Sequence, residues 1–197
     1  MAEPDFSLIQ PLEPSPRGWL DCVLADFDSF LADHASCEKK ASGMAMSMAS
    51  HYPDKPELLN AMADLAVEEL SHYREVIRLM SARGLSPTPD IKDPYVNALN
   101  RMVRKGAEVF LLDRLLLGAI VERRGAERFA CIAEAVTDPT LQKFYQAIAT
   151  SEARHWTLFY TLAWHHCDPQ AVSVRFVELS AAETEIMLKL PFRAALH

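Results

Sequence analysis

The stretch Glu69-Leu70-Ser71-His72 returns later in the chain as Glu152-Ala153-Arg154-His155. A single glutamate precedes each copy at nearly the same distance, since Glu38 lies 31 residues before Glu69 and Glu122 lies 30 residues before Glu152. Residues three apart on an α-helix differ by about 60° around its axis, so each copy projects its carboxylate and its imidazole from one face. The doubled pattern therefore predicts two helical hairpins, each carrying two glutamates and one histidine.

The composition also favours helices. Half of the 197 residues are hydrophobic, only six are glycine, and the strong helix formers Ala, Leu, Glu, Met and Arg are abundant. A chain of this length can bury a full hydrophobic core within one domain. We therefore expect an all-α protein with a proline-rich N-terminal arm over residues 1–18, surface-bound or disordered, and a single helical domain over residues 19–197.

Turn residues divide this domain into helices. Asp138-Pro139 and Asp168-Pro169 each combine an N-cap with a proline suited to a first helical turn, and Asp54 near Pro56 suggests another such start. The expected helices run from Trp19 to about Tyr52, from Pro56 to about Arg83, from Tyr95 to Lys105, from Ala107 to Val136 with an irregularity at Gly125, from Pro139 to about His166, and from Pro169 to about Leu190. The long connection over residues 84–106 can travel the length of a bundle, as a parallel second and third helix require.

Counting from each turn brings the glutamates of a hairpin to the same height. Asp54 lies 16 residues after Glu38 and 15 residues before Glu69, and at about 1.5 Å per residue the two side chains are level. The second hairpin, counted from Asp138, closes in the same way. Four carboxylates and two imidazoles around one point are the ligand set of ferritin-like di-iron and di-manganese bundles. We predict a ferritin-like four-helix bundle, with a long crossover between helices two and three and accessory helices including one at the C-terminus. The predicted metal ligands are Glu38, Glu69, His72, Glu122, Glu152 and His155.

The types of ligand indicate which metal is bound, and the height of each glutamate indicates which of two rivals is the ligand. A carboxylate-rich set suits iron or manganese better than zinc, which prefers fewer ligands and nitrogen or sulfur donors. Glu127 is the main rival to Glu122, but it lies only 11 residues before Asp138 and matches the height of Glu152 less well. The histidines without a partner pattern, which we expect at the surface or in helix caps, are His34, His51, His165 and His166.

Charge and cysteine usage exclude several classes of protein. A net charge of −7 argues against a generic nucleic-acid coat, although it allows a local basic patch. The four cysteines form no Cys-x-x-Cys pair, so neither a zinc knuckle nor an iron–sulfur module is indicated. The sequence shows neither a secretion signal nor an uncharged apolar stretch long enough to span a membrane. We expect a soluble cytoplasmic protein.

With the ligands in place, the chain resembles the bacterial tRNA hydroxylases that act on methylthio-isopentenyl-adenosine beside the anticodon, a branch of the ferritin-like proteins. The resemblance covers roughly residues 19–191. It rests on the blocks Glu38-Lys39-Lys40-Ala41, Glu68-Glu69-Leu70-Ser71-His72-Tyr73, Glu122-Arg123-Arg124-Gly125-Ala126-Glu127-Arg128-Phe129 and Ser151-Glu152-Ala153-Arg154-His155. The third block departs from the family's usual Glu-Ala-Arg-Ser-Cys-Glu-Arg-Phe at Arg123, Gly125 and Ala126.

This resemblance implies a non-haem di-iron monooxygenase that hydroxylates the isopentenyl group, with two iron ions as cofactor and dioxygen as co-substrate. An external electron donor such as a ferredoxin or a reductase is also implied, because the sequence carries no flavin or nicotinamide fingerprint. Basic clusters near the proposed ligands predict contacts to a tRNA anticodon stem-loop whose modified base is splayed out of its stack. The predicted RNA-binding residues are Lys39, Lys40, Arg101, Arg104, Lys105, Arg123, Arg124 and Arg128.

Three other functions share part of the pattern. An iron-storage or peroxide-scavenging ferritin-like protein would use the same six ligands, and so would a manganese catalase. Metal analysis with a peroxide assay distinguishes the catalase. A non-enzymatic helical interaction module would not need the ligands, so replacing Glu69 and His72 with alanine would leave its function intact.

Overall fold

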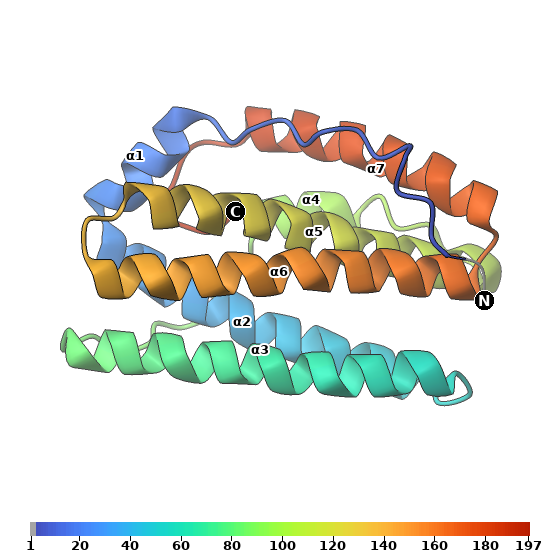
Figure 1. Cartoon of the computed structure of the whole chain (residues 1–197), viewed down its shortest axis with the longest axis horizontal. Coiled ribbons are helices and arrows are strands. Elements are labelled where there is room, and N and C mark those ends of the chain that lie inside the picture. The colour runs from blue at the N-terminus through green and yellow to red at the C-terminus, as the bar shows by residue number, and fades with distance from the viewer. Residues whose placement is uncertain (1–2) are drawn as a thin grey trace. The chain divides into compact units, whose positions relative to one another are not determined.

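The computed structural model describes residues 3–197, apart from the side chain of Glu108, so the first two residues of the predicted arm lie outside it. Regular structure in this range consists of helices α1 (Arg17–Ala25), α2 (Phe27–His51), α3 (Pro56–Ala82), α4 (Pro94–Asn100), α5 (Ala107–Ala135), α6 (Pro139–His166) and α7 (Pro169–Lys189) (Figure 1). Residues 3–197 contain no strand, which confirms the all-α prediction. None of the described helices combines the length and apolar character that crossing a membrane requires.

The chain divides into two compact units. The described part of the first comprises residues 3–20, Lys92–Pro191 and His197, and we call it the α4–α7 unit. The second comprises Asp21–Ile91 and Phe192–Leu196, and we call it the α2–α3 unit. Each unit contains one of the two hairpins expected from the sequence. A single domain over residues 19–197 stays a prediction.

In the α2–α3 unit, α2 and α3 pack along each other as an antiparallel hairpin (Figure 1). Their facing sides bury apolar residues at three- and four-residue spacing. These residues are Phe30, Leu31, Ala35, Ala45 and Met48 on α2, and Leu58, Met62, Leu65, Val76 and Met80 on α3. The Ser42 hydroxyl of α2 donates to the Ala66 carbonyl of α3 at 2.8 Å, so the helices also bond directly near mid-length.

Two expected features of this hairpin are wrong. The single helix over Trp19–Tyr52 is instead two helices, because Asp26 leaves the helical backbone (φ −138°) and its side chain caps α2. The first of them, α1, begins at Arg17. Asp54 does not cap α3, because Pro56 occupies its first turn and the cap therefore falls on Lys55, which makes no side-chain capping bond.

In the α4–α7 unit, α5 and α6 form the second antiparallel hairpin, and α7 packs against both (Figure 1). The short helix α4 contacts α5 and α7. Both predicted Asp-Pro starts are confirmed. The Asp138 carboxylate accepts from the Thr140 N–H at 2.7 Å, and the Asp168 carboxylate accepts from the Ala171 N–H at 2.8 Å.

Two expected features of this unit are also wrong. Helix α5 continues through Gly125 without a break, since one helical glycine costs only about 1 kcal/mol relative to alanine. The short helix ends at Asn100 rather than Lys105. Beyond it, the Arg104 N–H donates to the Asp113 carboxylate at 2.8 Å instead of to a helical carbonyl.

The N-terminal arm lies on the α4–α7 unit through specific contacts. The Phe6 ring packs against Trp156 and Tyr160 of α6, with ring centroids 5.8 and 5.2 Å apart. The Arg123 guanidinium donates to the Gln10 carbonyl at 2.7 Å. Of the two states expected for the arm, the described residues therefore adopt the surface-bound one.

A buried ion pair joins α5 to α7. The Arg124 guanidinium donates to the Glu183 carboxylate at 2.7 and 3.0 Å, and the two side chains are 0% and 1% exposed. The Tyr95 hydroxyl of α4 donates to the same carboxylate at 2.9 Å, and Arg124 also donates to the Glu13 carbonyl of the arm at 2.8 Å. Burial alone would lower the pKa of Arg124, but its bonds to Glu183 and the charge of that carboxylate raise it above its usual value. Arg124 is therefore charged, and the bonds of this pair connect the arm, α4, α5 and α7.

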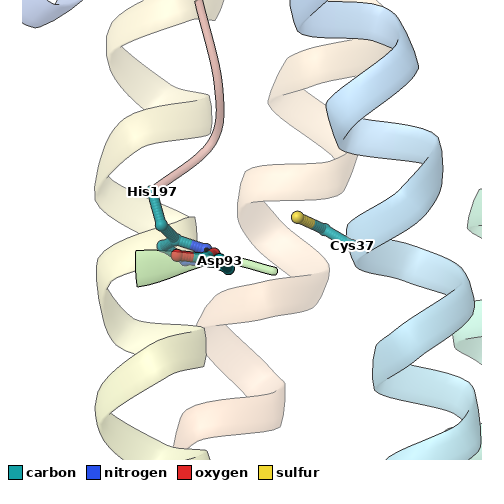
Figure 2. A group of neighbouring side chains, drawn as sticks. All are labelled: Cys37, Asp93 and His197. Carbon is teal, nitrogen blue, oxygen red and sulfur yellow. Dashed lines mark ion pairs between the residues drawn. The ribbon is translucent and has the colours of Figure 1, made fainter. Parts of the chain in front are cut away.

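The C-terminal residue packs on α4. The His197 ring stacks on Tyr95 with centroids 4.8 Å apart. Nδ1 of His197 lies 3.2 Å from the Asp93 carboxylate, and Figure 2 shows these two side chains together. Asp93 also caps α4 by accepting from the N–H groups of Tyr95 and Val96. Burial would raise the pKa of Asp93, but His197 and these N–H donors lower it to about 2.

Candidate metal centre

The α2–α3 unit brings together Glu38 from α2 with Glu69 and His72 from α3. Their ligand atoms lie within 4.8 Å of one another, and all three side chains are buried. Nδ1 of His72 is 3.5 Å from Oε2 of Glu38 and 3.5 Å from Oε2 of Glu69. Two carboxylates and one imidazole nitrogen therefore converge on one point, which we call the first half-site.

The α4–α7 unit repeats this arrangement with Glu122 from α5 and with Glu152 and His155 from α6. These ligand atoms also lie within 4.8 Å of one another, and the side chains are buried. Nδ1 of His155 is 3.4 Å from Oε2 of Glu152, while its Nε2 lies 3.4 Å from the Ser151 hydroxyl. In this second half-site, as in the first, Nδ1 is the ring nitrogen that faces a carboxylate.

The electrostatics of the first half-site suit a cation. Burial alone favours the neutral ring of His72, but the carboxylates of Glu38 and Glu69, each 3.5 Å from its Nδ1, raise its pKa to about 10. Burial would likewise raise the pKa of Glu38, yet the hydrogen bond from His34 and the nearby His72 ring hold it well below the usual value. The imidazolium thus places positive charge between two carboxylates. Oxygen-rich ligands with one imidazole suit a divalent iron or manganese ion, so the residues present fit such a metal.

His34 is a site residue that the sequence analysis placed wrongly, at the surface or in a cap. It is fully buried, and its Nε2 donates to Oε1 of Glu38 at 2.6 Å. Its ring also stacks on Phe30, with centroids 5.9 Å apart. Residues four apart share a helix face, so the spacing of Phe30, His34 and Glu38 along α2 was the available signal.

A family model described as tRNA-(MS[2]IO[6]A)-hydroxylase (MiaE) matches residues 7–197. The chain belongs to the MiaE family.

Two relatives of this MiaE-family chain carry the name tRNA 2-(methylsulfanyl)-N(6)-isopentenyladenosine(37) hydroxylase. The Pseudomonas putida protein is 40% identical over 175 residues, which cover 88% of this chain and 84% of that protein. The Salmonella typhimurium protein is 31% identical over 156 residues, which cover 79% of this chain and 57% of that protein.

A solved structure resembles the MiaE-family chain over nearly its whole length. It is described as Protein 43 with aldehyde deformylating oxygenase activity from Synechococcus, with a TM-score of 0.90 and 34% sequence identity. The match covers 96% of each chain. This similarity confirms the predicted ferritin-like fold class, and the buried glutamate and histidine clusters fit a di-iron site.

The rival ligand Glu127 has another role in the MiaE-family chain. Its carboxylate accepts from the Ser15 N–H at 2.8 Å and from the Ser15 hydroxyl at 2.7 Å, and it also pairs with Arg124 at 3.1 Å. These bonds hold the arm on α5, whereas Glu122 lies with Glu152 and His155.

The remaining histidines lie near helix ends. His51 is exposed in the last turn of α2, where its Nδ1 bonds the Ser47 carbonyl at 2.7 Å. His165 and His166 occupy the last turn of α6. The exposed position of His51 agrees with the surface role expected for it, whereas His165 and His166 are half-buried.

The basic residues proposed to contact RNA differ in exposure. Arg124 and Arg128, both predicted from the sequence to contact RNA, lie in the interior of the α4–α7 unit. The Arg128 guanidinium lies 4.6 Å from the centroid of the Trp19 ring and donates to the Ser15 hydroxyl at 3.0 Å. Burial, the main cause, lowers the pKa of Arg128 to about 10. Both side chains therefore stabilise the interior instead of facing solvent.

The other basic residues keep solvent-accessible surface. Lys39 pairs with Asp90 at 2.9 Å, and Lys40 donates to the Ile91 carbonyl at 2.8 Å. Arg104 forms an ion pair with Asp113 at 2.7 Å. Arg101 and Lys105 are also exposed, and Arg123 is half-buried beside Trp156.

Proposed function

We propose that this chain is a non-haem di-iron monooxygenase that hydroxylates the isopentenyl group of methylthio-isopentenyl-adenosine in tRNA, next to the anticodon. The observation that carries the proposal is membership of the MiaE family in a chain that contains two buried half-sites of the same composition. The proposed substrate is the one that the names of the two bacterial relatives give.

Two iron ions would be held by Glu38, Glu69, His72, Glu122, Glu152 and His155. Four carboxylates match the charge of two ferrous ions, and Nδ1 of each histidine is the donor that faces its carboxylate partners. When bound, the iron pair supplies the activation of dioxygen that oxidation of an alkyl C–H bond requires.

Apolar turns on both ligand-bearing hairpins would keep water away from this chemistry. Leu65 and Val76 lie one helical turn before Glu69 and one turn after His72, and Ile148 and Phe159 occupy the matching positions on α6. All four are 2% exposed or less. A dry surrounding protects a strong oxidant from water and stray reductants and suits the apolar isopentenyl group.

The tRNA would meet the protein through local basic patches, because a net charge of −7 does not favour contact over the whole surface. The residues with accessible surface for this role are Lys39, Lys40, Arg101, Arg104, Lys105 and Arg123. The modified base would be splayed out of its stack to reach the iron site. An external ferredoxin or reductase would deliver electrons, and a tRNA substrate would place the protein in the cytoplasm.

Charge reversal tests the tRNA contact. Arg101→Glu with Lys105→Glu should weaken tRNA binding and reduce its salt dependence, because each lost phosphate contact removes about 0.7–0.9 from the slope of log K against log salt. Unchanged affinity and slope would remove these two residues from the interface. Lys143→Glu, at an exposed position on α6, serves as the matched control because it reverses a charge in the same direction.

A second candidate is an oxygenase that acts on aldehydes. It is favoured by the 34% identity and 0.90 TM-score of the Synechococcus structure. The two candidates share the metal centre and differ in the substrate that reaches it.

The deciding experiment loads the purified chain with ferrous iron and adds a chemical reductant, dioxygen and tRNA that carries the modified adenosine. Mass spectrometry of the nucleosides should show a gain of one oxygen. Glu69→Ala should abolish this gain, whereas Glu75→Ala, an exposed position on the same helix, should not. A preparation with two irons per chain that leaves the nucleoside unchanged contradicts the proposal. Turnover of an aliphatic aldehyde by that preparation would support the second candidate, and rapid peroxide removal by a manganese-loaded one would indicate a catalase.

A further inference from the structure

Glu38 has two oxygens in different environments. Oε1 accepts the hydrogen bond from Nε2 of His34 at 2.6 Å, while Oε2 lies 3.5 Å from Nδ1 of His72. His34 is fully buried and Glu38 is 4% exposed, so little water competes for the first bond. A short bond to a buried carboxylate is charge-assisted and stronger than a neutral one. Oε1 is therefore occupied, and Oε2 is the oxygen directed at the other ligands of the half-site.

The His34 ring is itself held in place. It stacks on Phe30, which lies one turn earlier on α2 and is fully buried. A carboxylate accepts hydrogen bonds and cannot donate them, so Nε2 of His34 must carry the proton of this bond. The ring and the carboxylate thus fix each other's orientation.

The second half-site has no histidine at the matching position. The residue four before Glu122 on α5 is Gly118, which has no side chain to donate a bond. The space that a Cβ would take is filled by the Phe159 ring, whose nearest atoms lie 3.0 Å from that point. The bond from His34 to Glu38 therefore has no counterpart from this position, and the two half-sites differ in the residue that stands there.

We infer that His34 is a positioning residue that holds Oε1 of Glu38, so that Glu38 presents only Oε2 to a metal ion in the first half-site. The inference rests on the proposed function, because it assumes that the half-sites bind metal. Groups that orient metal ligands through hydrogen bonds typically change metal affinity by about 10- to 100-fold when they are removed. Loss of the His34 bond should therefore weaken one of two bound ions and leave the other largely unchanged.

Cobalt(II) provides a test that is independent of enzyme activity. The metal-free chain is titrated with Co²⁺ against a competing chelator, and the visible spectrum reports the number, affinity and geometry of the bound ions. Wild type should bind two ions. His34→Leu, which removes the donor but keeps an apolar side chain, should bind one of them about 10- to 100-fold more weakly, with a changed spectrum.

Three further variants complete the design. His34→Gln, whose side-chain amide carries an N–H donor, should restore much of the affinity. His51→Leu, an exposed histidine on the same helix, should bind like wild type. Circular dichroism and thermal unfolding of each metal-free variant check its folding, and His34→Met is a second loss variant because methionine adapts to irregular space.

The outcomes separate the inference from the proposed function. If wild type binds fewer than two ions, the proposed di-metal centre fails. If wild type binds two ions and a folded His34→Leu or His34→Met variant binds them equally well, the positioning role is refuted. If folded His34→Gln is as weak as the loss variants, the ring rather than its hydrogen bond matters, and the inference is again wrong.

Discussion

The buried pair of Arg124 and Glu183 predicts a large loss of stability when one partner is neutralised. Glu183→Gln keeps the shape of the side chain but removes its charge, which leaves the fully buried Arg124 guanidinium with Glu127, at 3.1 Å, as its remaining carboxylate. Breaking a buried pair by removing one partner costs about 3–5 kcal/mol. The amide oxygen of the variant can still accept from the Tyr95 hydroxyl, and Glu127 still pairs with Arg124, so the lower part of that range is expected. Domains are stable by only about 5–15 kcal/mol, so the variant should lose a substantial part of its stability.

Urea unfolding of the metal-free protein at pH 7, followed by circular dichroism, measures the change. Glu185→Gln is the matched control, because it lies on the same helix and its pair with Lys189 is exposed. That control should lose at most about 1 kcal/mol.

Replacing both partners distinguishes the free-energy cost of a buried arginine that has lost Glu183 from the net contribution of the ion pair to stability. Arg124→Met with Glu183→Leu removes both charges and fills similar space with apolar groups. Such replacements are often close to neutral, so the double variant should be more stable than Glu183→Gln alone. The reasoning would be refuted if Glu183→Gln unfolded within about 1 kcal/mol of wild type, or if the double variant were the less stable of the two.

Three further predictions concern protonation and packing. With a pKa of about 10, His72 is protonated at pH 7, so metal uptake should release about one proton from it, and metal affinity should rise with pH until about 10. An indicator dye in weak buffer measures the released protons. Metal uptake without proton release would contradict the assignment of a positive charge to His72. Gly118→Ala should destabilise the protein by about 1–3 kcal/mol, because the added Cβ would lie 3.0 Å from the Phe159 ring. Gly43→Ala should instead stabilise it by up to about 1 kcal/mol, because nothing lies within 4 Å of the added Cβ. Thermal unfolding of the two variants measures the difference. The pKa of Asp93 falls from 3.8 to about 2 on folding, so its contribution to folding stability is complete above about pH 4 and is lost as the pH falls towards 2. Asp93→Asn should therefore make stability depend less on pH in that range, which acid unfolding measures.

Local signals predicted most of the helix boundaries. Asp138 and Asp168 each stand directly before a proline, and an Asp-Pro dipeptide by itself predicts the capped N-terminus of a helix. The break at Asp26 was missed because Val23, Phe27 and Phe30 keep a three- and four-residue spacing straight through it. Hydrophobic periodicity indicates which residues are buried, and it does not reveal a local break in the helical backbone.

The residues of each half-site were also predictable from short-range spacing along the chain. A short turn fixes the register of two antiparallel helices, so counting from the turn shows which residues are level, and the three-residue spacing of Glu69 and His72 supplies the shared face. His34 was missed because a lone histidine on a helix has the same local pattern whether it is buried or exposed. The partnership of Arg124 with Glu183 was missed because the two residues lie on helices separated by all of α6, where local spacing carries no information.

The misplaced RNA contacts show how a cluster in sequence differs from a cluster in space. Adjacent helical residues point about 100° apart, so neighbours in sequence such as Arg123 and Arg124 can face different surroundings. Arg123 reaches the arm, whereas Arg124 and Arg128, four residues apart, share a face that the arm and α7 cover. Glu127, three residues after Arg124 on the same helix, pairs with it at 3.1 Å. Helical phase, rather than the density of positive charge along the chain, therefore separates the interior arginines of α5 from those able to meet a phosphate backbone.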